Sequence, residues 1–135
     1  MNSFSLKIVT PDGMQFDGQA QELIVRTTSG DLGIMAGHIN CVAPLGMGQA
    51  MVMTDGKKRY GACIGGMVSV VGGAVTLVPT TFEWADQIDV SRAEASRQRA
   101  QDVLQDKTSS QTDILLAEAR LKRALVRTSV AGNRK

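Results

Sequence analysis

The pattern of apolar and polar positions changes its period near residue 85. Before that point apolar residues alternate with polar ones, as at Phe4, Leu6 and Ile8, which is the period-two pattern of a half-buried strand. Further strand-like runs cover residues 22–28, 49–54, 59–64, 67–71 and 74–79. No helix-length segment separates these short runs, so they favour a sandwich or barrel over a parallel sheet. The sequence therefore predicts a small antiparallel β domain over residues 1–84.

Turn signals separate several of these runs. The segment TPDG at residues 10–13 predicts a turn, because proline presets φ and glycine accepts unusual backbone angles. The pairs Asp55-Gly56 and Gly72-Gly73 are typical of two-residue hairpin turns with positive φ. These signals support a chain that reverses direction often.

Residues 85–135 have a helical pattern. From Asp89 to about Asp106 the chain contains neither glycine nor proline, and Asp89 is placed to cap the helix that begins there. A polar break at residues 106–111 follows, and Ser110 with Asp113 predicts a capping box at the start of a second helix, which Gly132 ends. The two helices predict an αα-hairpin. The fold class expected is α+β, an N-terminal antiparallel β-sandwich followed by a C-terminal α-helical hairpin.

The apolar stripes of the two predicted helices are thin and rich in alanine. The expected stripes are Ala93, Ala100, Val103 and Leu104 on the first helix, and Ile114, Ala117, Leu121, Ala124 and Leu125 on the second. An alanine buries only one methyl group, so such a hairpin gains little from its own core and could dock, detach or rearrange. The pattern is equally compatible with a permanently docked helical pair.

Charge and composition exclude several classes of function. The net charge of +2 is too small to indicate a nucleic-acid partner, although residues 1–87 carry five basic and seven acidic residues and the rest carries ten basic and six acidic. Cys41 and Cys63 lie outside any metal-binding spacing, and His38 is the only histidine, so no zinc site is expected. The N-terminus lacks the pattern of a signal peptide, and no apolar run is long enough to span a membrane. A soluble protein without direct membrane insertion is expected.

An enzyme is not expected either. The lysine-bearing stretch TDGKKR at residues 54–59 lacks the first glycine of a phosphate-binding loop, and GGMVSVVGG at 65–73 lies between strands and opens no helix. His38 has no serine, cysteine or carboxylate placed to complete a catalytic set, and a solitary histidine is usually a loop residue with a local hydrogen bond.

Four segments resemble the ε subunits of bacterial F-type ATP synthases: IVTPDG, SGDLGIMAGHINCVAPL, IGGMVSV and IDVSRA, in this order. The resemblance covers nearly the whole chain and implies a non-catalytic subunit of the central stalk, peripheral at the cytoplasmic face of the membrane. It implies a sandwich that binds the γ subunit and the c-subunit ring of the membrane rotor, with Asp31 and His38 as candidates for contact with the ring. It also implies a hairpin that hinders ATP hydrolysis when it extends into the α/β catalytic hexamer, an encounter that its basic charge would guide.

The IDVSRA segment matches the motif with which some members of this family bind ATP. By that resemblance the ligand set is Glu83, Ile88, Asp89, Arg92, Ala93, Arg99, Arg123 and Arg127. No cofactor is required, and ATP is expected as a regulatory ligand, because arginines pair with phosphates in charge-assisted bonds. Two alternatives stay open: the arginines lie on a solvated face with partners four residues away, such as Arg120 with its acidic neighbours, or the chain is a coupling module without nucleotide binding. Ser91 is polar where nucleotide-binding relatives commonly have an apolar residue.

Overall fold

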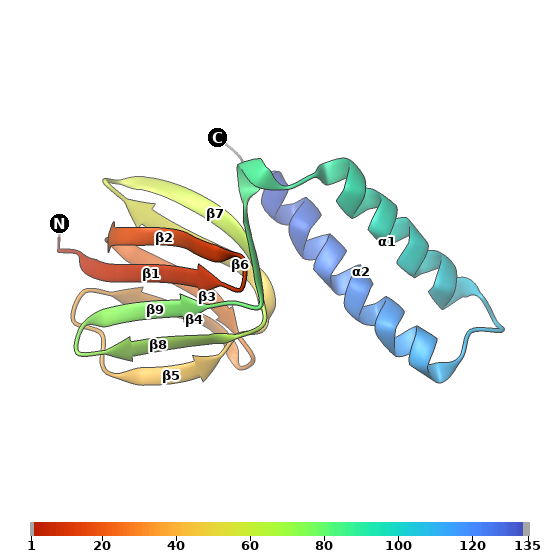
Figure 1. The fold of residues 1–135 in the computed structure, drawn as a ribbon, viewed down its shortest axis with the longest axis horizontal. Coiled ribbons are helices and arrows are strands. Elements are labelled where there is room, and N and C mark those ends of the chain that lie inside the picture. Colours follow the sequence, from red (N-terminus) through yellow and green to blue (C-terminus); the bar gives the residue numbers. More distant parts are fainter. Residues whose placement is uncertain (1, 134–135) are drawn as a thin grey trace. The chain divides into compact units, whose positions relative to one another are not determined.

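The computed structural model describes residues 2–133 and divides into two compact units, Met1–Trp84 and Ala85–Lys135 (Figure 1). Strands make up the first unit and helices the second. Each unit is described below by itself.

The first unit is a sandwich of two five-stranded sheets. In sheet order, the first sheet contains β2 (Gly13–Ala20), β1 (Phe4–Thr10), β9 (Ala74–Val78), β8 (Met67–Val71) and β5 (Cys41–Pro44). The second contains β10 (Thr81–Trp84), β7 (Lys57–Ile64), β6 (Met47–Thr54), β3 (Glu22–Thr27) and β4 (Gly30–Met35). Neighbouring strands pair antiparallel except β1 and β9, which run parallel with Leu6 opposite Val75. The predicted fold class is confirmed, with this one parallel pairing added to it.

The core of the sandwich comes from both sheets and follows the predicted alternation. Leu6 and Ile8 of β1 are fully buried, as are Leu23 and Val25 of β3. They belong to one apolar cluster with side chains from β6, β8, β9 and β10. Fully burying one such side chain contributes about 1.5–3 kcal/mol, so this cluster provides the sandwich with a substantial core.

Four of the strands were not predicted from the sequence: β2, β4, β5 and β10. Each of them lies at an edge of its sheet, while the six predicted strands are the inner ones. The two hairpin turns were predicted correctly, since Asp55 and Gly56 have φ of 52° and 74° and Gly72 and Gly73 have φ of 56° and 82°.

The last strand of the sandwich ends in a packed aromatic residue. The Trp84 ring lies 4.8 Å from the Phe82 ring, centroid to centroid, in an edge-to-face arrangement, and its indole N–H donates to the Gln15 carbonyl at 3.3 Å. The guanidinium carbon of Arg59 lies 3.8 Å from the ring centroid, a cation–π contact. These contacts fix the point at which the first unit ends.

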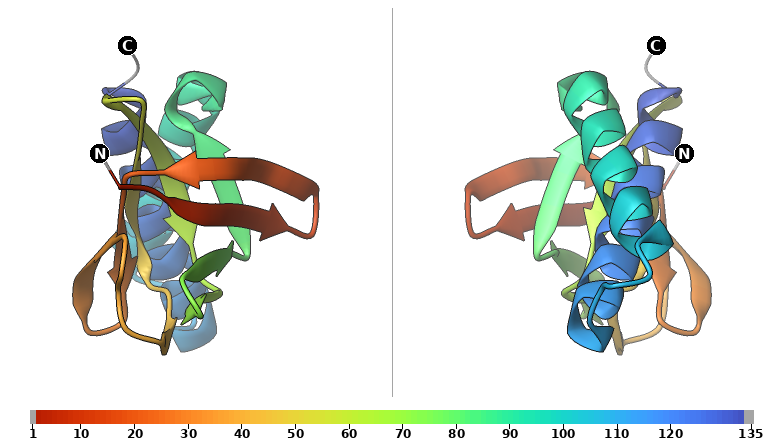
Figure 2. Two further views of the ribbon diagram at one scale, coloured as in Figure 1. Left: turned by 90° about the vertical axis from the view of Figure 1, so that its left-hand side faces the viewer. Right: turned by 90° about the vertical axis from the view of Figure 1, so that its right-hand side faces the viewer.

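The second unit consists of a short 3-10 helix, η1 (Ala85–Gln87), and two helices, α1 (Val90–Gln105) and α2 (Gln111–Ala131). The helices run side by side in every view (Figures 1 and 2). Both predicted N-caps are confirmed: the Asp89 carboxylate accepts from the Arg92 amide at 3.0 Å, and Ser110 forms a capping box with Asp113. Each cap satisfies backbone N–H groups that the helix itself leaves unpaired.

The hairpin core is as thin as the sequence predicts, although its membership differs. The alanines buried along the two helices are Ala93, Ala100, Ala117, Ala124 and Ala131. The prediction that Leu125 belongs to the buried stripe of α2 is wrong, because this residue is 49% exposed. Val130 and Ala131 near the end of α2 are buried instead. Within residues 2–133, no helix is both long and apolar enough to cross a membrane.

Candidate functional site

The hairpin carries a groove of about 850 Å³ that residues of both helices line. Its lining residues are Ser96, Arg99, Ala100, Val103, Asp106, Thr108, Ser109, Asp113, Leu116, Ala117, Arg120, Arg123 and Arg127. The floor includes the buried alanines Ala100 and Ala117. Alanine side chains are short, so they leave the space of the groove open between the longer polar side chains that surround them.

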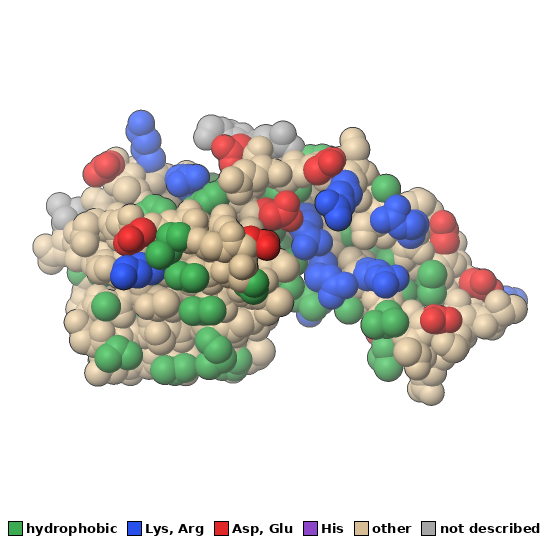
Figure 3. Space-filling view, viewed as in Figure 1, with side chains coloured by type: hydrophobic (Ala, Val, Ile, Leu, Met, Phe, Trp, Pro, Cys, Tyr) green, Lys and Arg blue, Asp and Glu red, His purple; other side chains and the backbone are tan. Residues whose placement is uncertain are grey.

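Four arginines are the main charged groups of this groove. Arg99 comes from α1, and Arg120, Arg123 and Arg127 come from α2. The three on α2 follow a spacing of three and then four residues, which places them on one face of the helix. A ligand in the groove would therefore meet guanidinium groups from two sides. Figure 3 shows Lys and Arg side chains gathered over the hairpin.

Three of these four guanidinium groups have no acidic partner in the part of the chain that the structure describes. Within residues 2–133, Arg99, Arg120 and Arg123 take part in no ion pair. Arg97 of α1, which does not line the groove, does have partners: it bonds the Glu94 carboxylate at 2.7 Å and donates to the Gln101 side chain at 3.0 Å. The groove thus presents donors that an anion could use.

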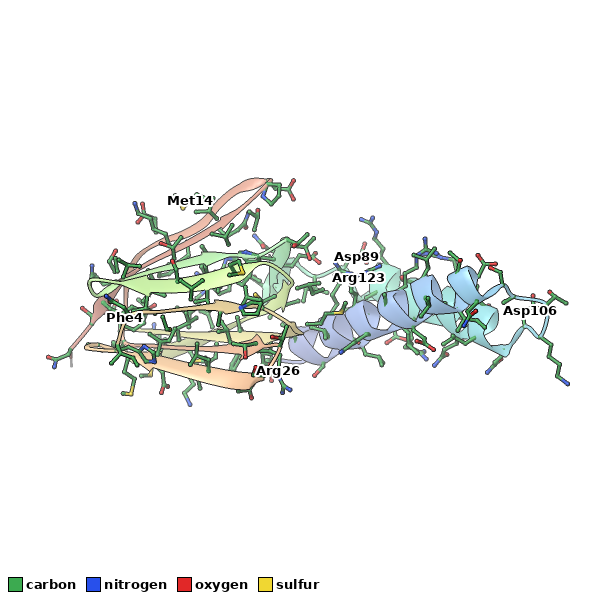
Figure 4. The ribbon with its side chains drawn as sticks, turned by 90° about the horizontal axis from the view of Figure 1, so that it is seen from below. Phe4, Met14, Arg26, Asp89, Asp106 and Arg123 are labelled. Carbon is green, nitrogen blue, oxygen red and sulfur yellow. The ribbon has the colours of Figure 1, made fainter. Side chains whose placement is uncertain are left out.

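The acidic side chains of the groove belong to its loop end. Asp106 ends α1 and Asp113 lies in the first turn of α2. Figure 4 shows Asp106 at the opposite end of α1 from Asp89. The backbone N–H and hydroxyl of Thr108 donate to the Asp106 carboxylate at 2.9 and 2.7 Å and lower its pKa below the usual value. The carboxylate that stabilises the loop is therefore held in its ionised form.

The structure brings together only part of the ligand set implied by the resemblance. Three of its members line the groove: Arg99, Arg123 and Arg127. The members at the start of the hairpin do not line it: Ile88, Asp89, Arg92 and Ala93. Glu83 belongs to β10 of the first unit, while every groove residue belongs to the second.

The residues at the start of α1 have distinct environments. Ile88 and Ala93 are each 5% exposed, whereas the Asp89 and Arg92 side chains are exposed. One oxygen of Asp89 caps the helix, which leaves its second carboxylate oxygen available as an acceptor. Asp89 can thus serve as helix cap and ligand contact together.

Arg120 is the groove residue that sequence reasoning missed. The open alternative in which Arg120 pairs with acidic neighbours is contradicted, because Arg120 forms no ion pair among residues 2–133. A signal was available, since Arg120 lies three residues before Arg123 and seven before Arg127, on one helix face.

The two residues expected to contact a partner, Asp31 and His38, lie near each other in the sequence but have different local structure and different bonding partners. Asp31 lies in strand β4, and its carboxylate bonds the Arg26 side chain on the neighbouring strand at 2.8 Å. Both side chains are more than half exposed, so this ion pair contributes little to stability. His38 follows β4, and its Nδ1 lies 2.8 Å from the Ile39 carbonyl oxygen, which is the local hydrogen bond expected of it.

The outer face of the first sheet carries exposed apolar side chains. Met67 of β8 pairs with Val78 of β9 and with Pro44 of β5, and all three side chains point away from the core. Val42 and Val71 on the same face are 63% and 61% exposed. Figure 3 shows hydrophobic side chains on this face. An exposed apolar surface of this kind is typical of a protein–protein contact.

Metal chemistry finds no support in the described part of the chain. Residues 2–133 contain no group of three or more His, Cys, Asp or Glu side chains that could hold a metal ion. Cys63 is buried, and burial raises the pKa of its thiol to about 12.

Comparison with known proteins gives a consistent result over the whole chain. The family model described as ATP synthase, delta/epsilon chain, beta-sandwich domain matches residues 3–85, and the one described as long alpha-helix domain matches residues 86–132. The chain is 44% identical to the ATP synthase epsilon chain of Bacillus velezensis, over 98% of this chain and 100% of that protein. It is 46% identical to the epsilon chain of Bacillus subtilis, over 98% of this chain and 99% of that protein.

Solved structures agree on the fold. A chain of the Euglena gracilis mitochondrial ATP synthase, in a structure of OSCP, F1 and c-ring, matches with a TM-score of 0.83 at 21% identity and covers 94% of this chain and 80% of its own. A chain of the Tetrahymena thermophila mitochondrial ATP synthase, in a central stalk and c-ring structure, matches with a TM-score of 0.61 at 14% identity, over 94% and 95%. At these identities the structural matches support the fold alone.

Proposed function

The chain belongs to the delta/epsilon family of ATP synthase subunits as a non-catalytic epsilon chain, and on that basis we propose that it is a rotor subunit of the central stalk. In this proposal it works in a proton-translocating F-type enzyme at the cytoplasmic face of the membrane. The sandwich couples the other subunits of the rotor, and the hairpin regulates ATP hydrolysis.

The sandwich is proposed to bind the γ subunit and the c-subunit ring. The exposed apolar side chains on the outer face of its first sheet support a protein partner there. Asp31 and His38 are proposed as contacts to the ring. Since Asp31 already bonds Arg26, a partner would have to replace or share that exposed ion pair.

The hairpin is proposed to bind ATP in the groove between its helices. The observation that carries this proposal is the set of four arginines from both helices around one groove. Guanidinium groups form charge-assisted, often bidentate bonds with phosphate oxygens. A ligand that contacts both helices stabilises the closed hairpin by RT ln(1 + [ATP]/Kd), which matters because the alanine core is thin.

Calorimetry on the isolated chain tests ATP binding. We expect wild type to bind ATP and Arg123→Ala to bind it roughly tenfold to a hundredfold more weakly, because a hydrogen bond to a charged group contributes about 1.5–3 kcal/mol. Lys122→Ala is the matched control, since Lys122 is an exposed cation on the same helix outside the groove. Equal losses in both variants, or no heat with wild type at millimolar ATP, would remove nucleotide sensing from the proposal.

Inhibition of hydrolysis is a separate part of the proposal. The extended hairpin would enter the α/β catalytic hexamer, guided by a segment that carries ten basic against six acidic residues from Ile88 onward. The test compares ATP hydrolysis by the assembled complex with and without residues 85–135. Faster hydrolysis without the hairpin supports regulation, and unchanged rates contradict it.

A second candidate function is a permanently folded brace that binds no nucleotide. The caps at both helix starts favour it, because Asp89 and the Ser110 capping box stabilise the helices without a ligand. Limited proteolysis distinguishes the two functions at residues 106–110. A brace resists cleavage equally with and without ATP, whereas a sensor is protected by ATP.

A further inference from the structure

The Arg26 side chain is half-exposed and yet held on two sides (Figure 4). Its Nε lies 2.8 Å from an Asp31 carboxylate oxygen, and the two residues are direct cross-strand partners on β3 and β4. Its aliphatic stem lies against β6 at Gly48, where an added Cβ would lie 2.5 Å from the Arg26 Cβ and 2.9 Å from its Cγ. The missing side chain at Gly48 therefore provides the space that the arginine occupies.

The backbone of Arg26 is held at the same place. Its carbonyl oxygen accepts a hydrogen bond from the Gly46 amide at 2.9 Å, and an added Cβ at Gly46 would lie 3.2 Å from the Thr27 carbonyl oxygen. Gly46 and Gly48 thus let their segment approach β3 closely. Because Arg26 is already ordered by these contacts, it loses less conformational entropy when it binds a partner.

The ion pair leaves polar groups available on both side chains. The contact with Asp31 uses the Nε donor of Arg26 and leaves the donors on both Nη atoms, while Asp31 keeps a second carboxylate oxygen as an acceptor. Neither side chain has another hydrogen-bond or ion-pair partner within residues 2–133. Donors and an acceptor therefore lie next to each other on a pair whose net charge is zero.

We propose that Arg26 and Asp31 act as one binding unit, which fits a segment of the c-subunit ring that presents a hydrogen-bond acceptor next to a donor. Such a segment is neutral and polar, like a backbone stretch with exposed C=O and N–H groups. A segment with a single positive charge fits less well, because Asp31 attracts it and Arg26 repels it. This inference rests on the proposed contact between Asp31 and the ring, and it adds Arg26 to that contact.

The test measures how tightly the complex of this chain with the γ subunit binds a purified c-subunit ring, by biolayer interferometry. Arg26→Ala and Asp31→Ala are each expected to weaken binding about tenfold, and the double variant about as much as either one, because each substitution breaks the same unit. Arg26→Lys is expected to behave like Arg26→Ala, since lysine lacks the planar fork of donors. Lys58→Ala, which removes an exposed cation from β7 of the same sheet, is the matched control and is expected to leave binding unchanged.

A thermal melt followed by Trp84 fluorescence checks the fold of each variant. We expect no shift in the melting temperature, because an exposed ion pair contributes little to stability. A loss of ring binding that comes with a lowered melting temperature contradicts a role of Arg26 in binding.

The outcomes distinguish the role of Arg26 from the proposed contact of Asp31. If Asp31→Ala weakens ring binding while Arg26→Ala leaves it unchanged or strengthens it, the role of Arg26 is refuted and the contact of Asp31 stands. Losses that add up in the double variant also refute a single binding unit. If neither substitution weakens binding, the contact of Asp31 is overturned as well, and a wild-type complex that does not bind the ring overturns the ring-binding function of the sandwich too.

Discussion

The cap of α2 offers a way to weaken the hairpin without removing a residue that lines the arginine groove. The Ser110 hydroxyl accepts from the Asp113 amide at 3.1 Å, and the Asp113 carboxylate accepts from the Ser110 amide at 3.4 Å. Ser110→Ala removes the first of these bonds and the geometry that supports the second. Ser110 does not line the groove, so the ligand contacts remain intact.

The expected cost is large relative to what holds the hairpin together. Loss of a serine N-cap costs about 1 kcal/mol, whereas the methyl groups of the five buried alanines contribute about 4 kcal/mol together. A loss of about 1 kcal/mol lowers the melting temperature of a small domain by roughly 4–8 °C. ATP at about four times its Kd would restore the lost stability.

Two probes follow the two units separately in a thermal melt. Helical circular dichroism reports on α1 and α2, and the fluorescence of Trp84, which is 4% exposed in the sandwich core, reports on the first unit. Ser110→Ala should lower the helical transition and leave the fluorescence transition in place. Ser91→Ala is the control, because Ser91 is exposed on α1 and its side chain forms no hydrogen bond within residues 2–133. A common shift of both probes, or no shift, would refute a separately unfolding, weakly held hairpin.

Two further predictions concern the sandwich. Gly66 has φ of +94°, and a side chain there would overlap the Val78 carbonyl, so Gly66→Ala should lower the free energy of unfolding by about 3 kcal/mol in urea denaturation. Gly33 has open space around it, so the control Gly33→Ala should change the free energy of unfolding little. Equal effects of the two substitutions would contradict the packing around Gly66. The pKa of the Cys63 thiol is about 12 in the folded protein, against 9.0 for an ordinary thiol. Above pH 9 the unfolded state therefore binds fewer protons than the folded state. As a result, the free energy of unfolding should fall as the pH rises from about 9 to 12. In the native protein a thiol reagent should modify the half-buried Cys41 and spare Cys63 until unfolding, and equal rates would contradict this burial.

Strand β2 shows why an edge strand is hard to predict from the sequence. A strand inside a sheet is buried on one face along its length, which produces the alternation seen at Leu6 and Ile8. The edge strand β2 (Gly13–Ala20) has only one buried residue, Ala20, so its pattern carries little signal. The parallel pairing of β1 with β9 joins segments far apart in the chain, and no local pattern encodes it. Turns and caps were predictable because their chemistry is local.

The candidate site was predictable only in part, for the same reason. The spacing of Arg123 and Arg127 on one helix face could be read from the sequence, and so could the cap at Asp89. Whether a cation is paired or faces a groove depends on the neighbouring helix, which decided the case of Arg120. The exposure of Leu125 was missed because the apolar stripe of α2 is narrow and alanine fills most of it.

Hydrogen exchange on the wild-type chain, with and without ATP, tests most directly whether a ligand holds the hairpin closed. Without ATP, amides of α1 and α2 should exchange much faster than those of the inner strands β1 and β3. With saturating ATP, the helical amides should become protected and the strands should not change. Helices as strongly protected as the strands in the absence of ATP, with no further protection when it is added, would contradict the account.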